Sequence, residues 1–407
     1  MKNLFDFFKI QDKINNLPCM QGFKWNKGIG EPPWDYYFLL NLSESEYPKY
    51  LAKLFYLNTG EKLPLSHGVI DKKRCKTFNQ KIQWIKLYGV TDLMRDCTDK
   101  VKVRDYVRKI IGAEYLKPVL QVIPSCHSEN LENQNVNSVD FQVVQNLKEE
   151  KSKKSQQSCC HPELVSGSDI NNNQKMLKHA CIDDNIQSKK INYTAVQHDR
   201  PLIDFVPKSN DVSTYFDLIN WDKLPSAFVI KTNHGCKWQY IIKDKEEFLK
   251  TPKLAEIVKH QIIGWLEQDY SFWGGFELNY HGIEPKILIE PLMRDNINKI
   301  CEEIQIYCCS GIPQLIIKLY NEQEITIYDE NLKISKNTLG FNEKRIDIEA
   351  DDLINQTFVL SKQLSKNFNF VRVDWLIFRN KIYFEELTFT PFSGFHKLIN
   401  NKIKFNF

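Results

Sequence analysis

A long polar segment, residues 126–200, interrupts a chain that is otherwise patterned for folding. It is rich in Asn, Gln, Ser, Lys and Glu, and its only aromatic residues are Phe141 and Tyr193. Such a composition buries too little apolar surface to offset the entropy lost on ordering. We therefore expect a disordered insertion, which is tolerated because loop-closure entropy grows only slowly with loop length. The core must then be assembled from the segments on either side.

The composition excludes several classes of protein. Lys and Arg number 55 against 51 Asp and Glu, a net charge of +4, whereas a general nucleic-acid binder usually carries a concentrated basic excess. A hydrophobic content of 42% is enough for a sizeable core. We find no apolar stretch of the ~18 residues that a membrane-spanning helix needs and no signal-peptide pattern. We expect a cytoplasmic protein with neither a nucleic-acid partner nor a membrane span.

The 11 cysteines include no Cys-x-x-Cys pair. We interpret those in patterned segments as small, reduced core residues. Cysteine and histidine lie close together at Cys126–His127, Cys159–His161 and His179–Cys181, all within the polar segment. These spacings match no zinc-ligand pattern, so the sequence disfavours a structural zinc site.

The hydrophobic periodicity predicts an α+β protein. Helical spacing covers 77–88, 99–112 (with Asp99 as N-cap), 246–269 and 351–367. Strand patterns cover 228–231 and 286–292, and two hairpins are expected at 304–320 and 371–386. Helices mixed with hairpins favour this class over a doubly wound sheet.

The last hairpin carries charged residues among apolar ones. Arg372 and Asp374 share a face of the first strand because side chains alternate with period two. Glu386 and Thr388 share a face of the second strand for the same reason. Whether the two pairs meet depends on the turn between the strands.

The turn can be built in two ways. A two-residue loop at Arg379–Asn380 pairs Asp374 with Glu385 and sends Glu386 to the opposite face. A three-residue loop over 378–380, with Asn380 left-handed in a bulge, brings the four polar residues together. We expect the second arrangement.

Two carboxylates beside an arginine suit magnesium–phosphate chemistry. Mg²⁺ takes oxygen ligands and is commonly shared between a few carboxylates and phosphate oxygens. The arginine can stabilise an anionic acyl or phosphoryl group. The alternative is a solvated strand face with a structural ion pair, which is more common among proteins in general.

A second group of candidates lies earlier in the chain. Lys231 ends an apolar strand and precedes Asn-His-Gly, so it can reach a phosphate that the loop backbone covers. Glu290 lies where another strand leaves the core into Glu-Pro-Leu, which can offer backbone groups to a planar base. Each signal is weak by itself.

Four motifs together resemble the teichuronopeptide-biosynthesis (TupA-like) ATP-grasp family: Lys76–Trp84, Asp99–Val107, Phe228–Gly235 and Glu386–Pro391. They occur in the family's order, and the likeness runs from about residue 55 to 398 with the insertion between. The pattern Arg-Val-Asp…Glu-x-Thr is also similar to the Arg-Val-Asp…Glu-x-Asn of D-alanine–D-alanine ligases. The resemblance implies two α+β subdomains that grip ATP. It further implies activation of a carboxylate as an acyl phosphate, which an amine then attacks.

The resemblance also implies roles for individual residues. Lys100 and Lys231 would hold the ATP phosphates, and Glu290 with Leu292 would form the adenine and ribose hinge. Asp374, Glu386 and Thr388 would bind Mg²⁺, and Arg372 would stabilise the transferred phosphoryl group or the tetrahedral intermediate. The remaining candidate contacts to phosphate or substrate are His234, Gly235 and Arg104.

Three departures from the family pattern bear on activity. The loop after Asn-His-Gly usually carries small residues but here reads Cys236–Trp238, which would stiffen or block a phosphate lid. A lysine is replaced by Gln305, and a glycine is replaced by Glu385. Reduced or lost activity is therefore among our hypotheses.

The leading hypothesis is an ATP-dependent ligase that joins a carboxylate of a cell-surface polysaccharide or its precursor to an amine donor. A sugar-nucleotide glycosyltransferase is the alternative, and it would need an Asp-x-Asp motif, for which 347–349 is a weak candidate. A third hypothesis is a degenerate binding protein that keeps the fold. The predicted segments are 1–54 (unassigned), 55–125 (helical part), 126–200 (insertion), 201–294 (nucleotide-binding subdomain) and 295–407 (subdomain with the metal site).

Overall fold

The computed structural model describes residues 36–123, 213–273, 275–294, 301–321, 324–336, 344–396 and 403. These residues belong to one compact unit. The predicted insertion with its Cys–His pairs, and residues 1–35 of the unassigned segment, lie outside the described residues. Within the described part of the chain, every helix is too short or too polar to cross a lipid bilayer.

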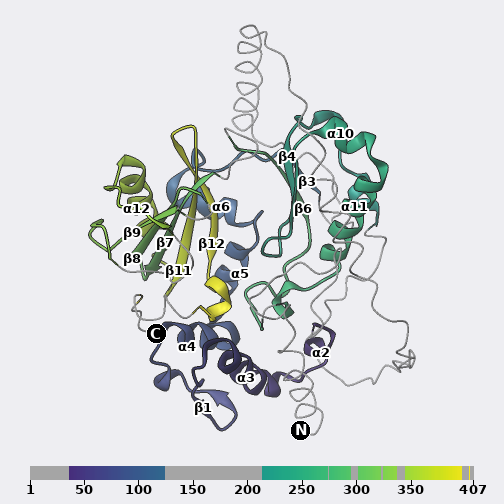
Figure 1. Cartoon of the computed structure of the whole chain (residues 1–407). Helices are drawn as coiled ribbons and strands as arrows, with labels where there is room; N and C mark the ends of the chain where they lie inside the picture. The colour runs from purple at the N-terminus through teal and green to yellow at the C-terminus, as the bar shows by residue number, and fades with distance from the viewer. Residues whose placement is uncertain are drawn as a thin grey trace. The chain divides into compact units, whose positions relative to one another are not determined.

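The larger sheet has six strands, and both predicted hairpins lie in it (Figure 1). The strand order is β10-β9-β8-β7-β11-β12, and all neighbours are antiparallel except β10 and β9. Ser310 and Gly311 take positive φ and close the first hairpin, as their position in the sequence predicts. The strands are β7 Glu302–Cys309, β8 Ile312–Leu319, β9 Glu324–Tyr328, β10 Lys344–Arg345, β11 Val371–Phe378 and β12 Lys381–Thr388.

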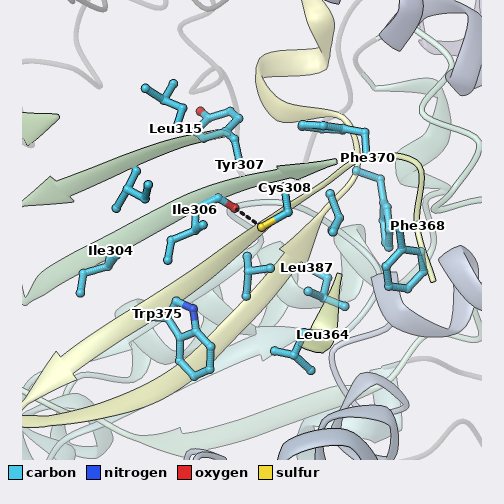
Figure 2. Close-up of a cluster of buried hydrophobic side chains, with 14 of the residues drawn as sticks. Ile304, Ile306, Tyr307, Cys308, Leu315, Leu364, Phe368, Phe370, Trp375 and Leu387 are labelled. Carbon is cyan, nitrogen blue, oxygen red and sulfur yellow. Dashed lines mark hydrogen bonds between the residues drawn. The ribbon is translucent and has the colours of Figure 1, made fainter. Parts of the chain in front are cut away.

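The two faces of this sheet differ in polarity. One face carries Ile304, Ile306 and Trp375, which Figure 2 shows within one buried apolar cluster. Helix α12 (Asp352–Leu364) packs on this face, and its Ser361 hydroxyl accepts a hydrogen bond from the Trp375 indole at 2.8 Å. Because side chains alternate along a strand, Arg372 and Asp374 point to the other face.

The smaller sheet has four antiparallel strands in the order β3-β6-β4-β5. They are β3 Gln121–Ile123, β4 Phe228–Thr232, β5 Gln239–Ile242 and β6 Ile287–Pro291. The apolar face packs on α11 (Pro252–Leu266), and α10 (Lys245–Lys250) lies next to this helix (Figure 1). The short helix α9 (Ser213–Asp217) also packs on α11. The predicted helix 246–269 is two helices, because Pro252 begins α11 and lacks the N–H that would continue α10.

The N-terminal elements form a third apolar cluster, in which Tyr50 and Phe55 are fully buried. The capping box at Thr77 starts α4 where the sequence predicts, and the helix ends in one π-helical turn, η4. The elements are α2 Tyr36–Leu40, α3 Tyr47–Thr59, β1 Leu65–Ser66, β2 Val69–Ile70, α4 Phe78–Trp84, η4 Ile85–Gly89, α5 Asp92–Thr98 and α6 Val103–Ile111. Short 3₁₀ turns occupy Glu44–Glu46, Lys72–Arg74, Trp221–Lys223, Tyr270–Phe272 and Pro391–Gly394.

Helix α6 begins at Val103, four residues after Asp99, because a turn over 99–102 precedes it. Asp99 caps this turn: its carboxylate accepts the N–H groups of Val101 at 2.8 Å and Lys102 at 3.4 Å, and its carbonyl accepts the Val103 N–H at 2.9 Å. The same carboxylate accepts the Asn233 side-chain amide at 2.9 Å. Asp99 therefore ties the turn that carries Lys100 to the loop after β4.

Candidate functional site

The final hairpin brings its polar residues together through a bulge. Arg379 and Asn380 form a two-residue turn with φ of 51° and 57°, so the expected three-residue loop is wrong. Asp374 nevertheless lies opposite Glu386, because Trp375 pairs with Phe384 and the register shifts there by one residue. The extra residue, Glu385, forms a β-bulge. The bulge puts Glu386 on the same face as Asp374, whereas a regular two-residue hairpin would put it on the opposite face.

Four side chains of this hairpin form a compact group, which we call the arginine–carboxylate cluster: Arg372, Asp374, Glu386 and Thr388. The Arg372 guanidinium donates to both Asp374 oxygens, at 2.7 and 2.5 Å. The Thr388 hydroxyl lies 2.9 Å from Glu386 Oε1 and 3.2 Å from Asp374 Oδ2. Both carboxylates therefore meet at one hydroxyl, on the face where the sequence predicts them.

The charges of this cluster do not balance. Burial raises the pKa of Asp374 to about 6, although Arg372 acts in the opposite direction. Burial also opposes ionisation of Glu386, but the positive charges of Lys100 and Arg372 outweigh it and lower the Glu386 pKa. Gln305, the register partner of Asp374 on β7, adds no positive charge. Within the hairpin itself, two carboxylates face one guanidinium, and this excess of negative charge favours a cation, although Lys100 offsets part of it.

A second group, the lysine–glutamate cluster, consists of Lys117, Lys231, Glu290 and Glu385. Glu290 Oε2 lies 2.6 Å from Lys231 Nζ and 3.0 Å from Lys117 Nζ. Glu385 Oε2 lies 2.5 Å from Lys117 Nζ, and its Oε1 lies 3.7 Å from Lys231 Nζ. Two positive and two negative groups thus form a balanced set.

Mutual attraction decides the ionisation of most of this cluster. Burial disfavours charge on Glu290, but the two lysines outweigh it and lower the Glu290 pKa to about 2. Burial also disfavours charge on Lys117, but Glu290 and Glu385 raise its pKa above the ordinary value. Lys231 responds differently: burial lowers its pKa, and repulsion from Lys117 acts in the same direction.

Two adjoining cavities share all four residues of the lysine–glutamate cluster. The larger, of about 120 Å³, is also lined by Leu292 and Met293 of the chain that leaves β6, and by Glu303 and Leu376 of the larger sheet. Burial and the charge of Asp374 raise the pKa of Glu303 to about 7. Glu290 and Leu292, the predicted hinge residues, therefore lie at a cavity. The prediction gave Glu290 a backbone contact to the base, whereas its side chain is also a counter-ion of two lysines.

Lys100 and Arg104 line the smaller cavity together with Lys117 and Lys231. The Lys100 ammonium donates to the Gly235 carbonyl at 2.6 Å, and the Lys100 N–H donates to the Asn233 carbonyl at 3.2 Å. The turn held by Asp99 thus presents a third lysine from a segment far away in the sequence.

His234 lines neither cavity. It is 1% exposed, its Nε2 lies 3.1 Å from the Trp265 carbonyl, and burial lowers its pKa to about 4. Trp238 is also buried, stacked on Trp265 and edge-on to Trp273. A Cβ at Gly235 would lie 2.2 Å from the Trp238 ring, so this close packing requires glycine. The loop after β4 is therefore anchored to the apolar core of the smaller sheet.

The loop after β12 is held by one face of α4 and its π-helical turn. Phe392, Ser393 and Gly394 all have positive φ, between 52° and 68°. Gln83 donates to the Ser393 and Gly394 carbonyls at 3.0 and 2.9 Å. The buried Lys86 ammonium donates to the Ser393 carbonyl at 3.1 Å and its hydroxyl at 2.8 Å. Backbone in this region is strained, and these bonds stabilise it.

Comparison with known proteins decides the family. The sequence profile described as "TupA-like ATPgrasp" matches residues 169–405, more than half of the chain. The chain belongs to the TupA-like ATP-grasp family. The predicted α+β ATP-grasp fold is confirmed by this membership.

Solved structures with local similarity to this TupA-like protein are also ATP-grasp enzymes. D-alanine–D-alanine ligase from Bacillus anthracis, complexed with ATP, is 18% identical (TM-score 0.23) and matches over 41% of this chain and 40% of its own. The Helicobacter pylori enzyme is 14% identical (TM-score 0.25; 45% and 44%). ATP-grasp ligase PsnB, complexed with precursor peptide PsnA2 and AMPPNP, is 10% identical (TM-score 0.23; 42% and 39%). The chain thus matches less than half the length of each. No curated protein matches it.

The residues of the TupA-like protein fit a magnesium ion at the arginine–carboxylate cluster. Asp374, Glu386 and Thr388 present oxygen atoms, which Mg²⁺ prefers, and the excess negative charge favours a cation. Among the described residues, no three His, Cys, Asp or Glu side chains gather into a metal site. A few protein ligands are what Mg²⁺ needs when nucleotide phosphates supply the others.

Sequence reasoning missed Lys117 and took Glu385 only as a departure from the family pattern. Lys117 lies in the segment that crosses between the sheets: Tyr115 accepts the Phe384 N–H of the larger sheet, and Leu120 donates to Ile289 of the smaller one. The one local signal for Lys117 is that this lysine lies shortly before strand β3. It also missed Lys86 and Glu277, which lie buried near each other behind the loop after β12.

Proposed function

We propose that this protein is an ATP-dependent carboxylate–amine ligase that requires Mg²⁺. When bound, Mg·ATP supplies the phosphoryl group that converts a carboxylate into an acyl phosphate, the form that an amine attacks. The observation that carries the proposal is that consecutive residues of β12, Glu385 and Glu386, belong to the two charged clusters. The bulge therefore places a cavity lined by lysines directly beside two carboxylates, Asp374 and Glu386, that can bind a cation.

Different residues of the chain bind the phosphates, the base with the ribose, and the metal ion. Lys100 and Lys231 bind the phosphates, and Lys117 adds a third ammonium to the same cavity. Glu290 and Leu292 bound the larger cavity, where the nucleotide base and ribose bind. Asp374, Glu386 and Thr388 hold the metal ion, and Arg372 stabilises negative charge on the transferred group.

The substrates are a carboxylate of a cell-surface polysaccharide or of its precursor, and an amine donor, as in teichuronopeptide-like biosynthesis. Family membership supports this assignment. The glycosyltransferase alternative needs acidic metal ligands at a site, whereas Asp347 and Glu349 are exposed and line neither cavity. A degenerate binding protein is favoured by one observation, the anchoring of Trp238 in the core.

Calorimetry of Mg·ATP binding tests the proposal. The parent should bind ATP only with Mg²⁺, and Asp374→Asn should lose the magnesium-dependent part. Asp222→Asn, at an exposed carboxylate, should bind like the parent. The proposal would be contradicted if the affinity for ATP were the same with and without Mg²⁺ and in Asp374→Asn, or if the parent did not bind ATP. Screening uronic-acid and amino-acid substrates for ADP release then separates a ligase from a protein that binds without turnover.

A further inference from the structure

Glu385 differs from the other members of the lysine–glutamate cluster. Lys117, Lys231 and Glu290 have side chains that are only 6–8% exposed, whereas the Glu385 side chain is 31% exposed. Lys231 and Glu290 lie on neighbouring strands of the smaller sheet, while Glu385 reaches them from β12 of the larger sheet. Glu385 is therefore the one carboxylate of the set that can withdraw without unfolding the sheet that holds the lysines.

The bulge is what aims Glu385 at the lysines. In regular alternation Glu385 and Glu386 would point to opposite faces. Because Glu385 is the inserted residue, its carboxylate reaches Lys117 at 2.5 Å while Glu386 still meets Asp374 through Thr388. The Phe384 N–H bonds to the Tyr115 carbonyl at 2.7 Å, which places β12 against the segment that carries Lys117.

We propose that Glu385 is an internal competitor of the nucleotide phosphates for Lys117 and Lys231, and so determines how strongly this site selects polyphosphate ligands. This inference rests on the proposed function, because it takes the lysine-lined cavity as the phosphate site. A carboxylate at ion-pair distance cancels the positive charge that would attract a phosphate, and it repels a phosphate that approaches. Glu290 already balances one of these two lysines, so Glu385 cancels the charge of the other. Lys100 and Arg104 are the further positive residues that line the smaller cavity.

A purely structural role for Glu385 makes the opposite prediction. If the carboxylate only joined the two sheets, its removal would lower stability and weaken ligand binding or leave it unchanged. In the competitor role, Glu385→Gln frees a positive charge, while Lys117 keeps Glu290 at 3.0 Å as a partner. Binding of polyphosphates should then become tighter, even if thermal stability falls.

The test is calorimetry on the full chain with three probes: Mg·ATP, magnesium tripolyphosphate and adenosine. Glu385→Gln should bind the first two roughly tenfold to a hundredfold more tightly than the parent. Adenosine, which carries no phosphate, should bind both proteins alike. The gain should shrink as salt rises, because it is electrostatic. The control is Glu330→Gln, which changes the net charge equally at an exposed residue and should match the parent.

The outcomes separate this inference from the proposed function. Equal or weaker Mg·ATP binding by Glu385→Gln, with normal binding by the parent, would overturn the competitor role and leave the ligase proposal standing. Failure of both proteins to bind Mg·ATP would overturn both. Binding by Glu385→Gln alone would support the competitor role most strongly. If Glu385→Gln does not fold, Glu385→Ala tests the same expectation.

Discussion

The two charged clusters differ in origin and in charge. The arginine–carboxylate cluster comes from one hairpin and carries two carboxylates against one guanidinium. The lysine–glutamate cluster comes from four separate segments and carries two positive and two negative groups. The first therefore favours a cation, whereas in the second an incoming anion competes with two carboxylates for the lysines. A site that binds Mg²⁺ and phosphate together needs both kinds of surface.

A change in the charge balance of the lysine–glutamate cluster should have the largest effect on stability and on nucleotide binding. Lys231→Met removes the closest partner of Glu290, at 2.6 Å, and leaves that buried carboxylate with Lys117 alone. We expect a loss of about 3 kcal/mol in the free energy of unfolding, and a marked loss of nucleotide binding. Urea unfolding and calorimetry measure the two effects.

The control for that prediction is a surface ion pair. Lys250→Met breaks the exposed pair with Glu246 and should change stability by no more than about 0.5 kcal/mol. Nucleotide affinity that is unchanged in Lys231→Met would remove this lysine from the site.

Lys86, which is buried behind the loop after β12, should make the stability of the protein depend on pH. Burial lowers the pKa of Lys86 to about 7, against 10.5 when unfolded. Between these values the folded protein binds fewer protons than the unfolded chain, so the free energy of unfolding rises with pH, by up to about 1.4 kcal/mol per pH unit. Urea unfolding from pH 7 to 9.5 should show this rise in the parent and a smaller one in Lys86→Met. Equal slopes in the two proteins would show that Lys86 keeps its ordinary pKa.

Removing the bridging hydroxyl should have a moderate effect on the arginine–carboxylate cluster. Thr388→Val keeps the shape of the side chain but removes the group between Asp374 and Glu386. We expect a loss of about 1 kcal/mol in stability and weaker binding of Mg²⁺ in the presence of ATP. A fluorescence titration with Mg²⁺ at fixed ATP measures the second effect. Thr214→Val, at an exposed residue of α9, provides the comparison, and equal magnesium affinity in the two variants would exclude Thr388 from the metal site.

The smallest effect should come from the turn of the hairpin. Arg379 and Asn380 both have positive φ, a conformation that Asn-Gly adopts with less strain. The double change Arg379→Asn and Asn380→Gly should stabilise the protein by about 0.5 to 1 kcal/mol without altering nucleotide affinity. A thermal melt that shows destabilisation would contradict the expectation that Asn-Gly relieves strain at this turn.

The sequence allowed the arginine–carboxylate cluster to be predicted because its four residues lie on one hairpin and obey the period of a strand. The turn was predicted incorrectly, because the bulge at Glu385 depends on contacts with Tyr115 and Lys117 from a distant segment. The α+β ATP-grasp fold was predictable from hairpins, helical spacing and motif order, and it is confirmed.

The lysine–glutamate cluster was only half predictable. Lys231 and Glu290 lie in strands with recognisable flanks, and both line the cavities. Lys117 lies in irregular chain whose path is fixed by both sheets, so its place shortly before a strand is too weak a signal to mark it. His234 illustrates the converse case: a histidine beside a glycine suggests a phosphate contact, but the packing of Trp238 and Trp265 determines where it lies.

The central claim is that one molecule of Mg·ATP binds to both clusters at once, and hydrogen exchange tests it most directly. With Mg·ATP bound, amide exchange should slow in both β4 and β12, and less so when Mg²⁺ is withheld. Slower exchange in only one of these strands, or in neither despite saturating nucleotide, would contradict the claim.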